Sequence, residues 1–172
     1  MDYNQLIASC SLAFGSGQFD ESLSLSVKAI AMEPKRCEGY NWAGKSCMSL
    51  DRPDDASQYF AKAVGIEPHN GNLFFLLGYS QVLSDQLANA LKSLTRALEY
   101  NCDSVLKGQV YKIISMINTQ KGDYQNALIN LEQAEELDGL DIEILEQRAA
   151  CYASLKDYHQ TIYTLNQIKL LS

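Results

Sequence analysis

The sequence predicts an all-α protein in which five helical hairpins follow one another as an α-solenoid. The heptapeptides KAIAMEP at 28–34 and KAVGIEP at 62–68 are almost identical, and their prolines lie 34 residues apart. Apolar and small residues recur at three- and four-residue intervals through most of the 172 residues, which is typical of amphipathic helices. A fixed period of this length indicates an array of one supersecondary unit, because each hairpin can bury its apolar side only against a neighbour.

The second helix of each hairpin is predicted from a segment with one recurring order of residues. A turn comes first, acidic or amide residues and a bulky apolar residue follow, and small and apolar residues then recur at helical spacing. Five segments have this order, at 17–34, 51–68, 85–102, 122–139 and 156–172. We therefore expect five second helices.

The first helix of each hairpin is predicted in the stretch before each of these segments. In YNWAGKSCMSL (40–50) and FFLLGYSQVLS (74–84), apolar and small residues recur at helical spacing, with Gly44 and Gly78 at equivalent places. The stretches at 6–16, 111–121 and 145–155 have the same pattern. Small residues at these places allow helices to approach closely, so the sequence predicts ten helices in five hairpins.

The pattern resembles the tetratricopeptide repeat, a helix-turn-helix of 34 residues with aromatic, Leu-Gly, Tyr, Ala, Phe and Pro at fixed positions. The matches are Gly17, Phe19, Ala29 and Pro34; Tyr40, Gly44, Ala56, Phe60, Ala63 and Pro68; Phe74, Leu77, Gly78, Ala90 and Ala97; Gly122, Asp123, Tyr124, Ala127 and Ala134; and Tyr152, Asp157 and Tyr158. The resemblance covers the whole chain. It implies one domain over residues 1–172, with repeats at about 3–36, 37–70, 71–104, 108–141 and 142–172, wound into a right-handed superhelix.

One interval departs from the period. Ala90 and Ala127 lie 37 residues apart rather than 34, and Cys102 stands where the third repeat would have its proline. Surface loops absorb insertions at little cost, so we expect a longer loop between Cys102 and Gln109.

Composition excludes several classes of partner. The net charge is −7, and the 14 lysines and arginines are scattered, which disfavours binding to nucleic acid or to an anionic membrane surface. No apolar run approaches the roughly 20 residues that span a bilayer, and the first residues have no basic segment, so we expect no membrane insertion and a cytoplasmic location. The five cysteines, Cys10, Cys37, Cys47, Cys102 and Cys151, are widely spaced, which favours reduced thiols over disulfides or a metal site.

The sequence predicts neither an enzyme nor a cofactor. The two histidines, His69 and His159, are far apart in the sequence, and neither has a catalytic or metal-ligand pattern around it. The phosphate-binding motif G-x-x-x-x-G-K-[ST] does not occur, and Gly15-Ser16-Gly17 fits a turn between helices.

The family resemblance implies that a partner binds the concave surface lined by the first helices. Carried over residue by residue, it places these side chains on that surface: Trp42, Lys45, Met48, Asn72, Phe75, Leu76, Tyr79, Val82, Lys112, Ile113 and Met116. The helix of the third repeat has more apolar residues than its packing requires, so we expect a hydrophobic groove centred there. The alternative is that these residues only pack neighbouring first helices together.

We therefore expect a non-enzymatic interaction scaffold or adaptor that binds an apolar or amphipathic peptide or helix. Two other functions stay open: an N-terminal regulatory or substrate-docking module of a larger enzyme such as a glycosyltransferase, and a cytosolic chaperone for secreted substrates. The last helix carries Ile162, Leu165 and Ile168 without a polar capping helix after it, which suggests possible self-association.

Overall fold

The structure is a computed structural model that describes residues 1–100 and 103–171, and within them it consists of helices and turns without strands. The helices form two compact units, Met1–Asn101 and Cys102–Ser172. Single-domain organisation over residues 1–172 stays a prediction. The all-α solenoid fold is confirmed, because ten helices lie in antiparallel pairs within the described residues.

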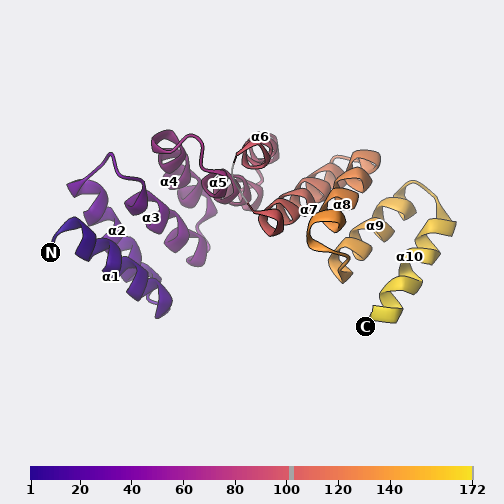
Figure 1. The fold of residues 1–172 in the computed structure, drawn as a ribbon, viewed down its shortest axis with the longest axis horizontal. Coiled ribbons are helices and arrows are strands. Elements are labelled where there is room, and N and C mark those ends of the chain that lie inside the picture. Colours follow the sequence, from indigo (N-terminus) through magenta and orange to yellow (C-terminus); the bar gives the residue numbers. More distant parts are fainter. Residues whose placement is uncertain (101–102, 172) are drawn as a thin grey trace. The chain divides into compact units, whose positions relative to one another are not determined.

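Unit 1 contains three hairpins, coloured indigo to pink in Figure 1. Its helices are α1 (Tyr3–Gly15), α2 (Phe19–Met32), α3 (Cys37–Ser49), α4 (Pro53–Ile66), α5 (Gly71–Leu83) and α6 (Leu87–Glu99). Within a hairpin the two helices pack along each other, and successive hairpins stack because α2 packs on α3 and α4 packs on α5. Each apolar side is thus covered by the next hairpin.

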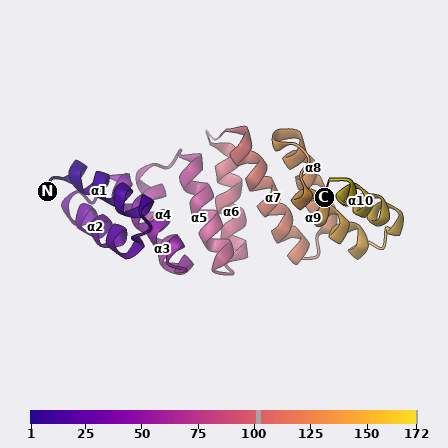
Figure 2. The ribbon, with the colours of Figure 1, turned by 90° about the horizontal axis from the view of Figure 1, so that it is seen from below.

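Unit 2 contains two hairpins, which Figure 2 shows from a second side. Its helices are α7 (Ser104–Gln120), α8 (Tyr124–Asp138), α9 (Ile142–Ser154) and α10 (Tyr158–Leu171). Stacking follows the same rule as in unit 1, since α8 packs on α9. Leu131, Ala134 and Ile144 form a buried cluster at this junction.

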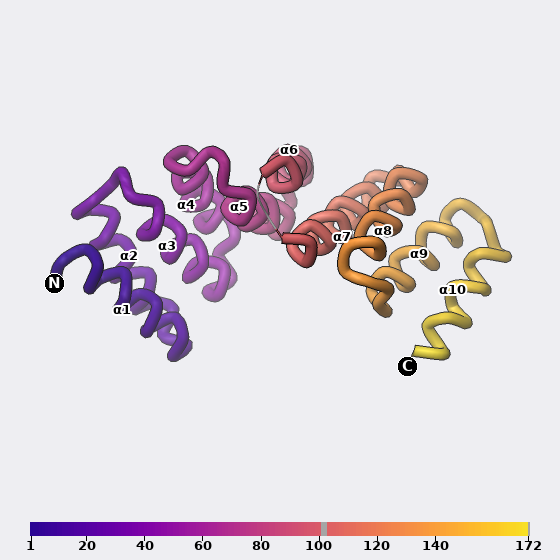
Figure 3. The backbone as a smooth tube through the Cα atoms, in the orientation of Figure 1, coloured from indigo at the N-terminus to yellow at the C-terminus, as the bar shows by residue number. Residues whose placement is uncertain are grey.

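The same turn closes all five hairpins (Figure 3). One residue in each turn has a positive φ: Gly17, Asp51, Asp85, Gly122 and Lys156. The N–H of the residue after it donates to the carbonyl five residues earlier, at 2.8 to 2.9 Å. These are the hydrogen bonds of a Schellman motif, which ends a helix by satisfying its last carbonyls. The turn is therefore set by backbone geometry and tolerates aspartate or lysine in place of glycine.

Hairpins close tightly because a glycine in one helix faces a large side chain in the other. A Cβ added at Gly44 would lie 2.6 Å from Cε1 of Phe60, and one at Gly78 would lie 2.7 Å from Cγ of Leu94. Phe60 and Leu94 are both fully buried. The small residues at these places therefore set the distance between the two helices of the second and third hairpins.

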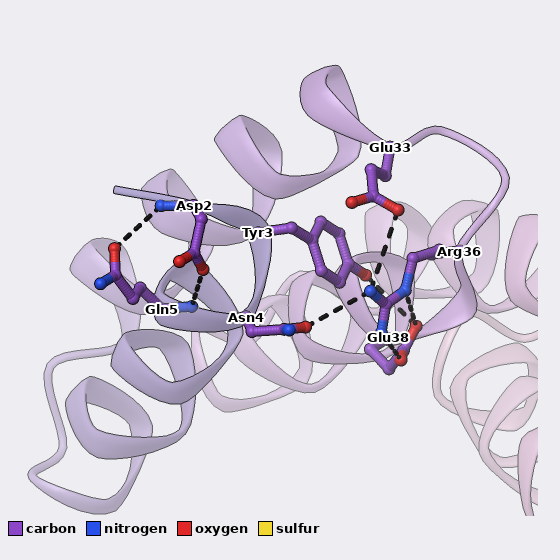
Figure 4. Close-up of polar contacts among 7 residues, drawn as sticks. All are labelled: Asp2, Tyr3, Asn4, Gln5, Glu33, Arg36 and Glu38. Carbon is purple, nitrogen blue, oxygen red and sulfur yellow. Dashed lines mark hydrogen bonds and ion pairs between the residues drawn. The ribbon is translucent and has the colours of Figure 1, made fainter.

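A polar cluster joins α1 to the start of α3, as Figure 4 shows. The Tyr3 hydroxyl donates to Glu38 at 3.2 Å, and the guanidinium of Arg36 lies 4.0 Å from the centre of the Tyr3 ring and 2.6 Å from a Glu38 oxygen. Burial, together with the negative charge of Glu38, raises the pKa of Tyr3 to about 12. Tyr3 therefore remains a neutral hydrogen-bond donor at physiological pH.

The predicted longer loop between the third and fourth repeats is wrong. The first helix of the fourth repeat begins at Ser104 rather than near 108, and it has 17 residues where α1, α3, α5 and α9 have 13. Asp103 caps it by accepting from the N–H of Leu106 at 2.8 Å, and the segment SVLK contains no residue that breaks a helix. The extra residues therefore add a helical turn. Cys102, at one end of the expected loop, lies outside the described residues.

We expect the two glycines Gly44 and Gly65 to respond in opposite ways to alanine. Gly65 lies in α4 with nothing within 4 Å of an added Cβ, so Gly65→Ala should raise the free energy of unfolding by about 0.5 kcal/mol through helix propensity. Gly44→Ala should lower it by roughly 1–3 kcal/mol, because the buried Phe60 ring must move. Chemical denaturation followed by circular dichroism measures both. A stabilising Gly44→Ala would contradict the close packing described above.

Candidate protein-binding site

An apolar stripe runs along α5 in unit 1. Phe75, Tyr79 and Leu83 are four residues apart and so lie on one side of the helix. The rings of Phe75 and Tyr79 stack with centroids 6.1 Å apart and planes 7° apart. Tyr79 is 39% exposed and Leu83 is 51% exposed, so this side of α5 presents apolar surface to solvent.

Two other predicted groove residues take part in the core packing of unit 1. Leu76 packs against two buried clusters, one around Ala63 and Leu73 and the other around Phe60 and Leu77. Met48 packs against the second of these clusters. Both side chains are half-buried, so they hold the second and third hairpins together and offer a partner only part of their surface. Val82, also predicted, is half-buried on α5.

The remaining predicted residues of unit 1 lie at the start of α5 and on α3. Trp42 is half-buried, with its ring 5.5 Å from the ring of Phe14 on α1 and the Lys45 ammonium 4.9 Å from its centre. Asn72 is exposed and lines an open hollow of 500 Å³ with residues 67–70. Trp42 thus has one face against α1 and the cation of Lys45 beside it.

In unit 2, a pocket of 410 Å³ lies between the first helices α7 and α9. It is lined by Met116, Thr119, Gln120, Gln147 and Ala150, none of which carries a charge. Met116 is 44% exposed. It is among the side chains that the sequence places on the partner-binding surface, whereas the other four lining residues are not. The side-chain oxygen of Gln147 is buried and accepts no hydrogen bond within the described residues. The pocket therefore has largely apolar walls, and one of its lining residues holds a buried, unpaired acceptor.

Lys112 belongs to an ion-pair cluster in unit 2. Its ammonium lies 2.9 Å from Asp141 and 3.2 Å from Glu143, and the side chain is only 11% exposed. Burial alone would lower the pKa of Lys112, but hydrogen bonds to Asp141 and Glu143 outweigh it and raise that pKa. Lys112 therefore links α7 to the start of α9. Ile113, the neighbouring predicted residue, is half-buried on α7.

The unpredicted pocket residues continue the register of the predicted ones. Trp42, Leu76, Ile113 and Gln147 follow one another at intervals of 34, 37 and 34 residues, and so do Lys45, Tyr79, Met116 and Ala150. Extending the register to the fifth repeat would therefore have found Gln147 and Ala150. Thr119 and Gln120 lie one turn beyond Met116 on the same helix, which is the signal that would have found them.

The described residues contain no group of three metal-binding side chains and no helix both long and apolar enough to cross a bilayer. The ring of His69 lies edge-on to that of Tyr100, with centroids 5.1 Å apart, and His159 is exposed on α10. The cysteines Cys10, Cys37, Cys47 and Cys151 are buried free thiols. Burial raises the pKa of each thiol, and burial together with the charge of Glu67 raises the pKa of Cys37 to about 12.

Comparison with known proteins identifies the repeat. The family model of the tetratricopeptide repeat matches residues 38–70 and 106–139, which correspond to the second and fourth hairpins. No curated protein sequence matches the chain. These two matches, together with the helical hairpins of the same kind in the rest of the described residues, support a protein of the tetratricopeptide repeat family.

Several solved structures have a similar fold. MamA is similar over 96% of this chain and 89% of its own, with a TM-score of 0.90 and 17% identity. MamA from Desulfovibrio magneticus RS-1 covers 99% of this chain and 96% of its own, with a TM-score of 0.89 and 14% identity. YrrB, described as a TPR protein with an unusual peptide-binding site, is similar over 97% of this chain and 84% of its own. Its TM-score is 0.84, and its sequence is 22% identical.

We expect the four buried cysteines to resist alkylation in the folded protein at pH 8. A pKa raised from about 9 to about 12 lowers the thiolate fraction of Cys37 by roughly a thousandfold, and the thiolate is the reactive form. Mass spectrometry after brief iodoacetamide treatment, with and without guanidinium chloride, gives the extent of modification at each site. Equal labelling of Cys37 in both conditions would contradict its burial.

Proposed function

We propose that this chain is a non-enzymatic scaffold that binds an apolar or amphipathic peptide or helix on the exposed side of its first helices. The observation that carries the proposal is the α5 stripe, in which the stacked pair Phe75 and Tyr79 continues to the exposed Leu83. Aromatic side chains that are rigid and partly exposed are the usual anchors of protein interfaces. The core packing of the hairpins leaves this surface open.

An amphipathic helix suits the stripe better than a charged tail does. Three apolar side chains spaced by four residues give a narrow ridge along one helix, which complements the apolar face of another helix. Lys45 beside Trp42 adds a cation at the edge of the second hairpin. The peptide-binding site named for YrrB supports peptide recognition by a chain of this fold.

The proposed setting is the cytoplasm, where buried free thiols such as Cys10 and Cys37 stay reduced. A chaperone that shields an apolar segment would use the same α5 surface. A regulatory module of a larger enzyme would also use the α5 surface. It would need a second apolar contact with the rest of the enzyme, and the apolar face of α10 offers that contact.

The last helix, α10, presents an apolar face of its own. Ile162 is 60% exposed and Leu165 is 51% exposed. Leu165 has the register position of Phe60, Leu94 and Leu131, all of which are fully buried. We infer that two copies of the chain associate through this face, because burying these side chains removes apolar surface from water.

We expect Tyr79→Glu to weaken binding of a labelled amphipathic peptide of Leu, Ala and Gln by about 2 kcal/mol, or roughly thirtyfold. The substitution places a charge in the apolar contact, and Tyr79 is exposed enough for the fold to persist. Fluorescence anisotropy measures the affinity. Val27→Glu, at an exposed apolar position on α2, is the matched control and should bind as the wild type does. Unchanged affinity in a folded Tyr79→Glu variant would refute the α5 site.

We expect sedimentation velocity to show a dimer of the wild-type chain and a monomer of Leu165→Glu, because the new carboxylate would have to lose its hydration in the contact. Leu12→Glu supplies the control, since Leu12 is 74% exposed on α1, outside the proposed interface, and its replacement should leave the dimer intact. A wild type that stays monomeric at all concentrations would rule out this contact.

A further inference from the structure

The carboxamide of Gln147 has unused hydrogen-bonding capacity beside the pocket of unit 2. Its nitrogen donates to Glu143 at 3.4 Å, at the long limit for a hydrogen bond. Its oxygen is buried without a partner in the described residues. A buried polar atom that stays unpaired costs on the order of 1–3 kcal/mol. Such a cost calls for an explanation in a folded protein, and a bound ligand supplies one.

Neighbouring polar groups are already engaged. The hydroxyl of Thr119, also in the pocket wall, lies 3.3 Å from the sulfur of Cys151. Arg148, next to Gln147 on α9, pairs with Glu135. Gln147 differs from both because its nitrogen is weakly held and its oxygen is unpaired, so its side chain can rotate and turn the amide toward the pocket.

The walls of the pocket indicate a neutral occupant. Met116, Ala150 and the carbon atoms of Thr119, Gln120 and Gln147 make its surface largely apolar, and a charge placed there would lose its hydration without a compensating ion pair. Met116 is flexible enough to adapt to different apolar shapes. The volume of 410 Å³ lies at the lower end of the range, about 300–1,000 Å³, in which proteins hold small ligands.

We propose that this pocket takes one uncharged apolar side chain of a bound peptide, while the carboxamide of Gln147 pairs with the backbone amide next to that side chain. The inference rests on the proposed function and adds to it the chemistry of one contact. The Gln147 oxygen accepts the peptide N–H, and the second N–H of its nitrogen, which the long contact with Glu143 does not use, donates to a peptide carbonyl. Because of this hydrogen bond, the pocket favours a ligand with a free backbone amide over a ligand that offers only apolar surface.

A titration of the ¹⁵N-labelled full chain with N-acetyl-L-leucine N-methylamide tests this contact. We expect saturable shifts of the backbone amide signals of Met116, Thr119, Gln147 and Ala150, with a dissociation constant on the order of 1 mM for a ligand this small. N-acetylglycine N-methylamide lacks the apolar side chain and should give no saturable shift. The leucine probe methylated at both amide nitrogens lacks the N–H groups and should bind roughly five to ten times more weakly.

Gln147→Met separates the hydrogen bond from the apolar contact. Methionine keeps the length of the side chain and removes the amide, so this variant should bind both leucine probes equally weakly. Gln125→Met is the matched control, because Gln125 is exposed on α8 and outside the pocket, and it should keep the wild-type preference.

Shifts confined to other helices, or wild-type preference in Gln147→Met, would overturn the assignment. The same holds if no probe gives a saturable shift. These results are distinct from failure of the proposed function, because binding of the amphipathic peptide and its loss in Tyr79→Glu are measured on unit 1.

Discussion

The close approach of two helices within a hairpin is the contact on which the rest of this structure depends. Gly44 under Phe60 and Gly78 under Leu94 bring the helix axes together, and the buried side chain fills the space. Each helix can then pack on the other in only one rotational setting about its own axis, because the small residue must face the large one. That rotation decides which side of each first helix meets the neighbouring hairpin and which side is left uncovered. The stacking of the second and third hairpins and the exposed α5 stripe both follow from it.

Repetition builds the scaffold, and differences at equivalent positions give each repeat its own surface. Phe75 and Lys112 have the same register position, yet the first stacks on Tyr79 and the second is held by Asp141 and Glu143. Likewise Leu76 packs into the core of unit 1, whereas Gln147 stands beside a pocket in unit 2. The common backbone can therefore carry an aromatic ridge in one place and an ion pair in another without a change of fold.

Polar clusters connect successive first helices in both units. Tyr3 of α1 donates to Glu38 of α3, which Arg36 also contacts, and Lys112 of α7 pairs with Asp141 and Glu143 at the start of α9. Each cluster holds one largely buried polar group, Tyr3 or Lys112, that would be costly to leave unpaired, so it favours one alignment of the two helices. Hydrophobic contact alone is less directional. These clusters thus add specificity to a stack held together by apolar burial.

The sequence by itself determined the repeat pattern, the five hairpins and nearly all helix positions, because each rests on local spacing that repeats about every 34 residues. It did not determine whether the extra residues before Gly108 form a loop or a helical turn, since either accommodates the same length, and the cap at Asp103 decides it. Nor did it separate Tyr79, which is exposed, from Leu76, which is packed, or reveal that Lys112 pairs with a residue 29 positions away. Helical spacing shows which residues share a face, but only the tertiary structure shows what covers that face.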